Sequence, residues 1–115
     1  MRLRRSAAAA LGALALALAL PTSAQAAEGQ FRYTYLTGEG YEAVGFLNNP
    51  PSGQCINLHG ADSNDLPPAH SPKNRTDSTA VVFADADCQG DVYFSLRPHT
   101  GGGSERLTVR SVIFS

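Results

Sequence analysis

Short runs of alternating apolar and polar residues recur along the chain, and no stretch after residue 26 repeats apolar positions at the period of a helix. Alternation at a period of two is typical of a β-strand that has one face on a core. The runs predict six strands, at residues 31–35, 41–47, 54–58, 79–84, 91–96 and 107–114. Six strands with turns between them predict an all-β fold, either a β-sandwich or a Greek-key barrel.

Segments that favour turns separate these runs. Residues 48–53 and 85–90 are expected to be turns, because asparagine and glycine accept left-handed backbone and proline fixes φ. Residues 60–74 are polar and contain three prolines, which predicts a long surface loop of the kind that is often functional or mobile. Residues 98–104 contain three consecutive glycines and are expected to form a flexible loop.

A long apolar run of a different character occupies residues 7–20, near the start of the chain. Three arginines precede it, and the small-residue pattern Ala24-Gln25-Ala26 follows it. This order is typical of a secretory signal peptide, and the run is shorter than the roughly 20 residues of a membrane-spanning helix. We therefore expect residues 1–26 to be a helical, cleavable signal peptide. Residues 27–115 are expected to form a single secreted, extracellular domain.

The net charge depends on this division of the chain. The full chain carries a formal charge of −1, but three of its nine basic residues and none of its ten acidic residues precede residue 27. The remaining 89 residues therefore carry a charge of −4. They contain no run of basic residues interleaved with aromatic ones, so neither nucleic acid nor a membrane is an expected partner. We expect the domain to be a monomer.

Two cysteines, Cys55 and Cys88, lie in the predicted domain. In an exported protein an even pair is typical of a disulfide, whereas a metal site or a catalytic thiol would need partner residues that the sequence does not offer. Closing a loop of this length is expected to stabilise the fold by roughly 3–4 kcal/mol.

The last third of the chain contains a spaced motif of aromatic, glycine and serine residues. Phe83 is followed seven positions on by Gly90, then by Tyr93, and Ser111 opens the final predicted strand. This pattern resembles the Greek-key motif of βγ-crystallin-like proteins over residues 80–114. The resemblance implies a small Greek-key β-sandwich with one disulfide.

An earlier segment repeats part of the same frame. Phe46 is followed seven positions on by Gly53 and then by a short predicted strand. Ser78, however, lies only five residues before Phe83, so one stretch would have to serve as the last strand of one motif and the first strand of the next. Either this first motif is degenerate, or the N-terminal hairpin replaces part of it.

The signal peptide and the small disulfide-linked domain are also similar to secreted proteins of actinomycete bacteria, among them protease inhibitors and killer-toxin-like proteins. The resemblance implies a secreted binding protein, and we expect a protease inhibitor whose partner is an extracellular protease. The alternatives are an antimicrobial or killer-toxin-like protein, and a structural extracellular protein with no catalytic activity. Two proline-stiffened loops are the candidate binding residues: Asn48, Asn49, Pro50 and Pro51, and Leu66, Pro67, Pro68 and His70.

Catalytic and metal chemistry are not expected. Some βγ-crystallins bind calcium through a leading pair of oxygen ligands, but here Asn74 keeps one ligand position and Lys73 occupies the other, whereas calcium needs six to eight oxygens. His59, His70 and His99 lack the spacing of a zinc site, and the chain has no Gly-x-Ser-x-Gly signature of a serine hydrolase. We therefore expect a protein that is not an enzyme and that uses neither a metal nor another cofactor. Asn74 also begins an Asn-Arg-Thr glycosylation sequon.

Overall fold

The computed structural model describes residues 26–115. The predicted signal peptide and its helix therefore lie outside the described residues, apart from Ala26. Within the described part of the chain, no helix is long and apolar enough to cross a membrane.

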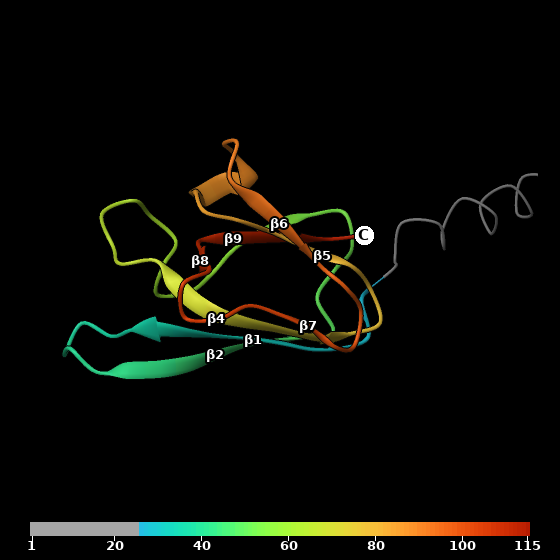
Figure 1. Cartoon of the computed structure of the whole chain (residues 1–115), viewed down its shortest axis with the longest axis horizontal. Coiled ribbons are helices and arrows are strands. Elements are labelled where there is room, and N and C mark those ends of the chain that lie inside the picture. Colours follow the sequence, from blue (N-terminus) through green and yellow to red (C-terminus); the bar gives the residue numbers. More distant parts are fainter. Residues whose placement is uncertain (1–25) are drawn as a thin grey trace, which may run out of the picture.

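Two antiparallel sheets form the protein (Figure 1). The first sheet has the order β2-β1-β4-β7, and β8 also pairs with β4. Its strands are β1 (Gly29–Leu36), β2 (Glu42–Asn48), β4 (Ala69–Thr76), β7 (Gly101–Gly102) and β8 (Thr108–Val109). The second sheet has the order β3-β9-β5-β6 and consists of β3 (Cys55–Asn57), β5 (Ala80–Phe83), β6 (Tyr93–Leu96) and β9 (Ser111–Phe114). The predicted all-β fold is confirmed.

The chain follows the same path twice. In the first half β1 and β2 form a hairpin, β3 joins the other sheet, and β4 returns beside β1. In the second half β5 and β6 form a hairpin, β7 joins the other sheet, and β9 returns beside β5. Each sheet therefore contains the third strand of the other half.

The core lies between the two sheets and is built from alternating positions, as the period of two predicts. Phe31 and Tyr33 of β1 point inward, as do Val82 of β5 and Val112 and Phe114 of β9, and all five are buried. The rings of Phe31 and Phe114 meet edge to face across the two sheets, with centroids 5.6 Å apart. Such a pair adds about 0.5–1.5 kcal/mol to the burial of apolar area.

Strand β4 corrects the prediction of a surface loop over residues 60–74. Only the first part of that segment is a loop, and the rest is a central strand of the first sheet. The inward positions of β4 are Ala69, Pro72, Asn74 and Thr76, all of which are buried. Since two of these four are polar, the segment lacks the apolar alternation by which a strand is recognised in a sequence.

Asn74 explains how polar residues are accommodated in the core. Its Nδ2 donates to the carbonyl oxygens of Ser78, Leu96 and Arg97, at 2.8, 3.1 and 3.1 Å. Its Oδ1 accepts hydrogen bonds from the backbone N–H and the hydroxyl of Thr76. Every polar atom of the side chain is thus paired, as buried polar groups require. The sequon asparagine is wholly buried and is not accessible to a glycosylating enzyme in the folded protein.

Two further predictions are corrected in the second half. The glycine-rich segment expected to be a flexible loop contains β7, and Gly101 passes so close to the backbone of Arg97 that a side chain would collide with it. The final strand predicted over 107–114 is divided at Arg110. Its first part is β8 in the first sheet, and its second part is β9 in the second sheet.

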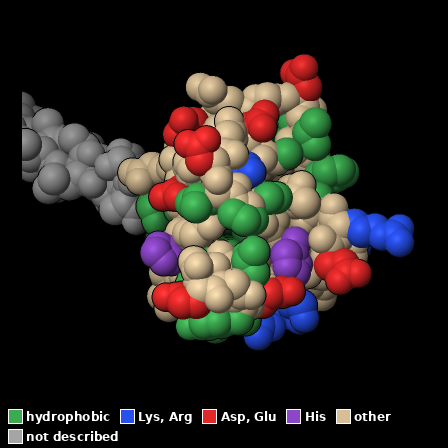
Figure 2. All heavy atoms as spheres, turned by 90° about the vertical axis from the view of Figure 1, so that its left-hand side faces the viewer, with side chains coloured by type: hydrophobic (Ala, Val, Ile, Leu, Met, Phe, Trp, Pro, Cys, Tyr) green, Lys and Arg blue, Asp and Glu red, His purple; other side chains and the backbone are tan. Residues whose placement is uncertain are grey.

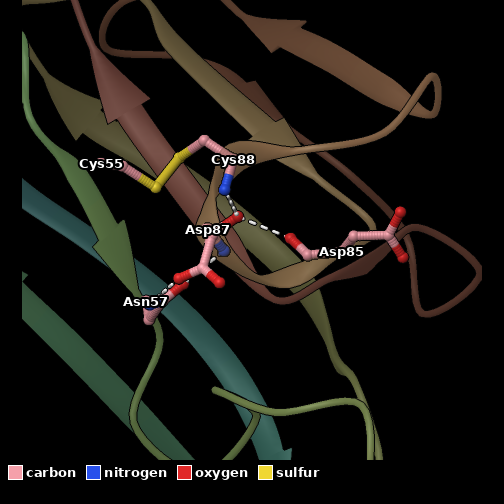
Figure 3. The surroundings of a disulfide bond; sticks show 6 residues. Cys55, Asn57, Asp85, Asp87 and Cys88 are labelled. Carbon is pink, nitrogen blue, oxygen red and sulfur yellow. Dashed lines mark hydrogen bonds between the residues drawn. A yellow bond between two sulfur atoms is a disulfide. The ribbon is translucent and has the colours of Figure 1, made fainter.

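The predicted Cys55–Cys88 disulfide is present and fastens a folded turn onto the second sheet (Figure 3). The turn contains a single 3-10 segment, η2 (Ala86–Cys88), and Asp87 and Cys88 adopt positive φ angles of 62° and 52°. Asn57 of β3 exchanges two hydrogen bonds with Asp87, at 2.8 and 2.9 Å. Disulfides are typical of proteins outside the cytoplasm.

Candidate functional site

The four residues of the aromatic–glycine–serine motif meet at the folded turn. The rings of Phe83 and Tyr93 lie 5.8 Å apart, and Gly90 has a φ of +91° that favours glycine. Ser111 accepts a hydrogen bond from the backbone N–H of Cys88 and donates one to the carbonyl of Asp85, at 2.9 and 2.6 Å. These contacts hold the turn against the sheet, so the motif serves the fold.

The earlier frame over Phe46 and Gly53 does not correspond to this turn. Phe46 lies in β2, the second strand of its half, whereas Phe83 lies in β5, the first strand of its half. The counterpart of the β5–β6 hairpin in the first half is the β1–β2 hairpin. That the N-terminal hairpin replaces part of a first motif stays a prediction.

The two predicted binding loops lie at opposite ends of the sandwich (Figure 1). Asn49 is hydrogen-bonded to Gly29, the first residue of β1. Leu66 lines the same hollow as Leu36, the last residue of β1. A strand of eight residues separates the two ends by roughly 3.3 Å per residue. The two loops therefore cannot contact one small ligand together.

The loop of Asn48–Pro51 is tied to the start of the described chain. The backbone of Asn49 donates to Gly29, and its side chain accepts from the Gly29 N–H, both at 2.8 Å. Pro50 is buried and accepts a hydrogen bond from Ala27, and Pro51 bridges to Ala26. These contacts close one end of the sandwich, while Asn48, Asn49 and Pro51 stay exposed.

The opposite end carries a hollow of about 290 Å³. It lies between the β1–β2 turn and the β3–β4 loop, and its lining includes Tyr35, His59, Gly60 and Leu66. Three apolar side chains at this end are strongly exposed: Leu36 (41%), Tyr41 (62%) and Leu66 (40%). We call these three residues and the hollow the apolar end. Figure 2 shows this face, with hydrophobic side chains gathered near its middle and histidine and acidic side chains around them.

Contacts with β1 fix the position of the β3–β4 loop at the apolar end. The hydroxyl of Tyr33 donates to the carbonyl of His59 at 3.1 Å, and the ring of His59 meets that of Tyr35 edge to face. Gly60 has a φ of +87°, and any side chain there would collide with the ring of Tyr35. Burial raises the pKa of Tyr33 to about 12, with a further contribution from the nearby Tyr35.

Hydrogen bonds also fix the rim of this end. The β1–β2 turn is closed by Thr37, whose N–H and hydroxyl both donate to the carbonyl of Tyr41, at 2.8 and 2.9 Å. The guanidinium of Arg110 donates to the carbonyls of Ala61 and Ser63 in the β3–β4 loop. The apolar end is thus a preorganised surface.

His70, predicted as a loop residue, lies in β4 on the outer face of the first sheet. Its Nδ1 is 2.8 Å from the hydroxyl of Ser71, and its Nε2 is 3.1 Å from a carboxylate oxygen of Glu42. Within residues 26–115 this is the one close contact between a basic and an acidic side chain, and it is an ion pair only when His70 is protonated. In the same part of the chain no three histidine, cysteine or acidic side chains cluster in a way that could hold a metal ion.

Two surfaces were not anticipated from the sequence. Arg32, Lys73 and Arg75 share the outer face of the first sheet, although Arg32 is far from the other two in the chain. Strand β6 forms an edge of the second sheet and exposes about half of Phe94, beside a hollow of about 430 Å³. Strand pairing creates both surfaces, and the pairing partners cannot be read from either local stretch of sequence.

Comparison with protein-family models, with curated proteins and with solved structures gives no match for this chain. The structure therefore defines only the fold class, an all-β protein of two antiparallel sheets with one disulfide, which joins β3 of the second sheet to η2.

Proposed function

We propose that the chain is a secreted binding protein that recognises another extracellular protein through the apolar end. The observation that carries the proposal is the exposure of Leu36, Tyr41 and Leu66 on two segments that are fixed by hydrogen bonds and ring contacts. Protein interfaces centre on a few apolar and aromatic side chains surrounded by a polar rim. Glu39 and Asp65, which are exposed in the same two segments, supply an acidic rim.

Preorganisation supports binding as the purpose of this surface. Ordering a flexible loop on binding reduces affinity, whereas a loop that is already ordered loses little entropy. Pro67 and Pro68 follow Leu66 directly and restrict the backbone beside an exposed apolar side chain. For this reason an extracellular protease is the partner class we propose, with the chain acting as its inhibitor.

We further propose that the fold is a βγ-crystallin-like pair of Greek keys. Each half has a hairpin, a third strand in the opposite sheet and a fourth strand beside the first. The contacts of Ser111 with the folded turn also support this assignment, because they join a serine at the start of the last strand to the hairpin of the same half.

The test is a panel of purified metallo- and serine proteases assayed for inhibition and for binding by the secreted protein. Leu66→Asp and Tyr41→Asp are expected to weaken binding at least tenfold, because each places a charge at the centre of the apolar contact. Val92→Asp is the matched control, since it makes the same kind of change at an equally exposed apolar residue beside β6.

Two results would count against the proposal. Failure of the wild-type protein to inhibit or bind any protease of the panel would exclude an inhibitor of those classes. Equal losses for Leu66→Asp and Val92→Asp would show that binding does not depend on the apolar end.

A further inference from the structure

The outer face of the first sheet gathers half of the basic residues of the described chain. Phe31 and Tyr33 of β1 point inward, so Arg32 between them points outward. In the same way Asn74 of β4 points inward, and Lys73 and Arg75 on either side of it point outward. The strand register pairs Arg32 directly with Lys73, so two of the three cations are immediate neighbours across the sheet.

No acidic side chain compensates this pair. Within residues 26–115 the one close contact between a basic and an acidic side chain joins His70 to Glu42 and involves none of the three cations. Like charges directly opposite each other destabilise a sheet. The pair is also unexpected in a domain that carries more acidic than basic residues. The pair therefore lowers the stability of the free protein. An anion bound between the two side chains would remove this repulsion.

A hollow of about 210 Å³ lies between these cations. Arg32 and Lys73 line it, together with the hydroxyl-bearing Thr34 and Ser71. The Nε of Arg32 is buried and has no hydrogen-bond partner among residues 26–115. A buried donor without an acceptor is costly, and this cost adds to that of the like-charged pair in the free protein.

The chemistry of the hollow favours an oxyanion. A guanidinium group presents a fork of donors that matches the oxygens of phosphate or sulfate, and a lysine adds a compact positive charge. Arg75 lies two residues from Lys73 on the same face of β4, so a second anionic group could bind about 7 Å further along the strand. Phe46 pairs with Arg32 on the other side and offers an exposed apolar surface beside the hollow.

We propose that this cationic face, defined by Arg32, Lys73 and Arg75, binds an anionic polymer that carries repeated phosphate or sulfate groups. One such group binds in the hollow between Arg32 and Lys73, and the next group binds at Arg75. A polymer is favoured over a membrane because Lys73 and Arg75 follow a line along β4, with Arg32 beside Lys73. The exposed apolar residues of this face, Leu36, Val44 and Phe46, lie on β1 and β2 rather than on β4.

The test is calorimetric titration of the purified secreted protein with polyphosphate and with dextran sulfate. The wild-type protein is expected to bind at low ionic strength, and affinity is expected to fall as sodium chloride is raised. Arg32→Gln and Lys73→Gln are each expected to weaken binding at least tenfold. Arg106→Gln, which removes the same charge from an exposed loop outside this face, is expected to change affinity less than twofold.

Thermal unfolding separates loss of the site from loss of the fold. Arg32→Gln and Lys73→Gln each remove one charge of an unpaired like-charged pair, so their unfolding temperatures are expected to equal or exceed that of the wild type. Lys73 is exposed, which makes its variant a safe second probe if Arg32→Gln fails to fold.

Three results would overturn the proposal. The first is an absence of wild-type binding to either polymer at low salt. The second is an equal loss of affinity in Arg106→Gln, which would indicate non-specific attraction. The third is binding to vesicles of phosphatidylglycerol but to neither polymer, which would identify the face as a membrane contact.

Discussion

Tyr33 combines burial with a titratable group at the base of the apolar end. Its side chain is 2% exposed, and its hydroxyl donates to the carbonyl of His59. Burial favours the neutral phenol and raises the pKa of Tyr33 to about 12 in the folded protein, whereas an unfolded tyrosine ionises near 10. The stabilisation that Tyr33 contributes is therefore complete below pH 10 and is lost as the pH rises through 12.

Replacing Tyr33 with phenylalanine should abolish this alkaline loss. At pH 7 the variant is expected to be about 1 kcal/mol less stable than the wild type, because one hydrogen bond is removed. Between pH 10 and 12 the wild type should lose roughly 2–3 kcal/mol more than the variant does. Urea unfolding followed by circular dichroism at a series of pH values measures both effects.

Tyr41→Phe is the control for this experiment, since it removes the same hydroxyl group from a tyrosine that is largely exposed. Its stability should follow that of the wild type at every pH. If Tyr33→Phe lost as much stability at alkaline pH as the wild type, another group would be responsible.

Asn74 marks the limit of prediction at the scale of residues. The apolar members of the core, such as Phe31 and Val82, could be predicted from alternation, and the pairing of Cys55 with Cys88 from their number and compartment. Asn74 could not be predicted, because its burial depends on three carbonyl groups that the fold brings to it from Ser78, Leu96 and Arg97.

Among the elements, the folded turn around η2 depends on a covalent link to β3. Cys55 and Cys88 are 33 residues apart, so their disulfide closes a loop that spans the junction of the two halves. The hydrogen bonds of Ser111 and Asn57 also hold the turn, which allows it to keep its position in a variant without the disulfide.

Replacing both cysteines with alanine should reduce the free energy of unfolding by about 3–4 kcal/mol while leaving the far-ultraviolet circular dichroism unchanged. Urea unfolding of the two proteins measures the difference. Adding a reductant should lower the stability of the wild type by a similar amount and should leave the variant unaffected. A difference below about 1 kcal/mol would mean that the hydrogen bonds alone constrain the turn.

The strands found and missed by sequence analysis differ in how they are stabilised. Strands β1, β2, β3, β5 and β6 carry apolar or aromatic residues in alternation and were predicted within a few residues of their bounds. Strand β7 consists of two glycines, so it has no side-chain pattern, and it is a strand only because β4 pairs with it. Its identity depends on a contact with a segment nearly thirty residues earlier in the chain.

At the scale of the whole molecule, the surface is more strongly divided in charge than the sequence indicates. The expectation that nucleic acid and membranes are not partners was based on a linear chain without a basic run. Arg32 and Lys73 are far apart in that chain, yet the register of β1 and β4 places them side by side. The apolar end was partly predicted through Leu66, but its other exposed residues come from the β1–β2 turn, and their proximity to Leu66 is a property of the fold.

The exchange of third strands between the sheets makes this protein a candidate for reconstitution from two pieces. Cutting the chain between Asp77 and Ser78 would give one fragment that retains β3 but lacks its partner β9, and one that retains β7 but lacks its partner β4. Neither fragment alone should unfold cooperatively, whereas an oxidised equimolar mixture should recover the β-sheet circular dichroism of the intact chain. Because Cys55 and Cys88 fall in different fragments, the recovered complex should migrate as one covalent species on a non-reducing gel. Each half is then expected to fold only on the other half. If each fragment were fused to one of two interacting proteins, recovery of the fold would report that the two fusion partners associate.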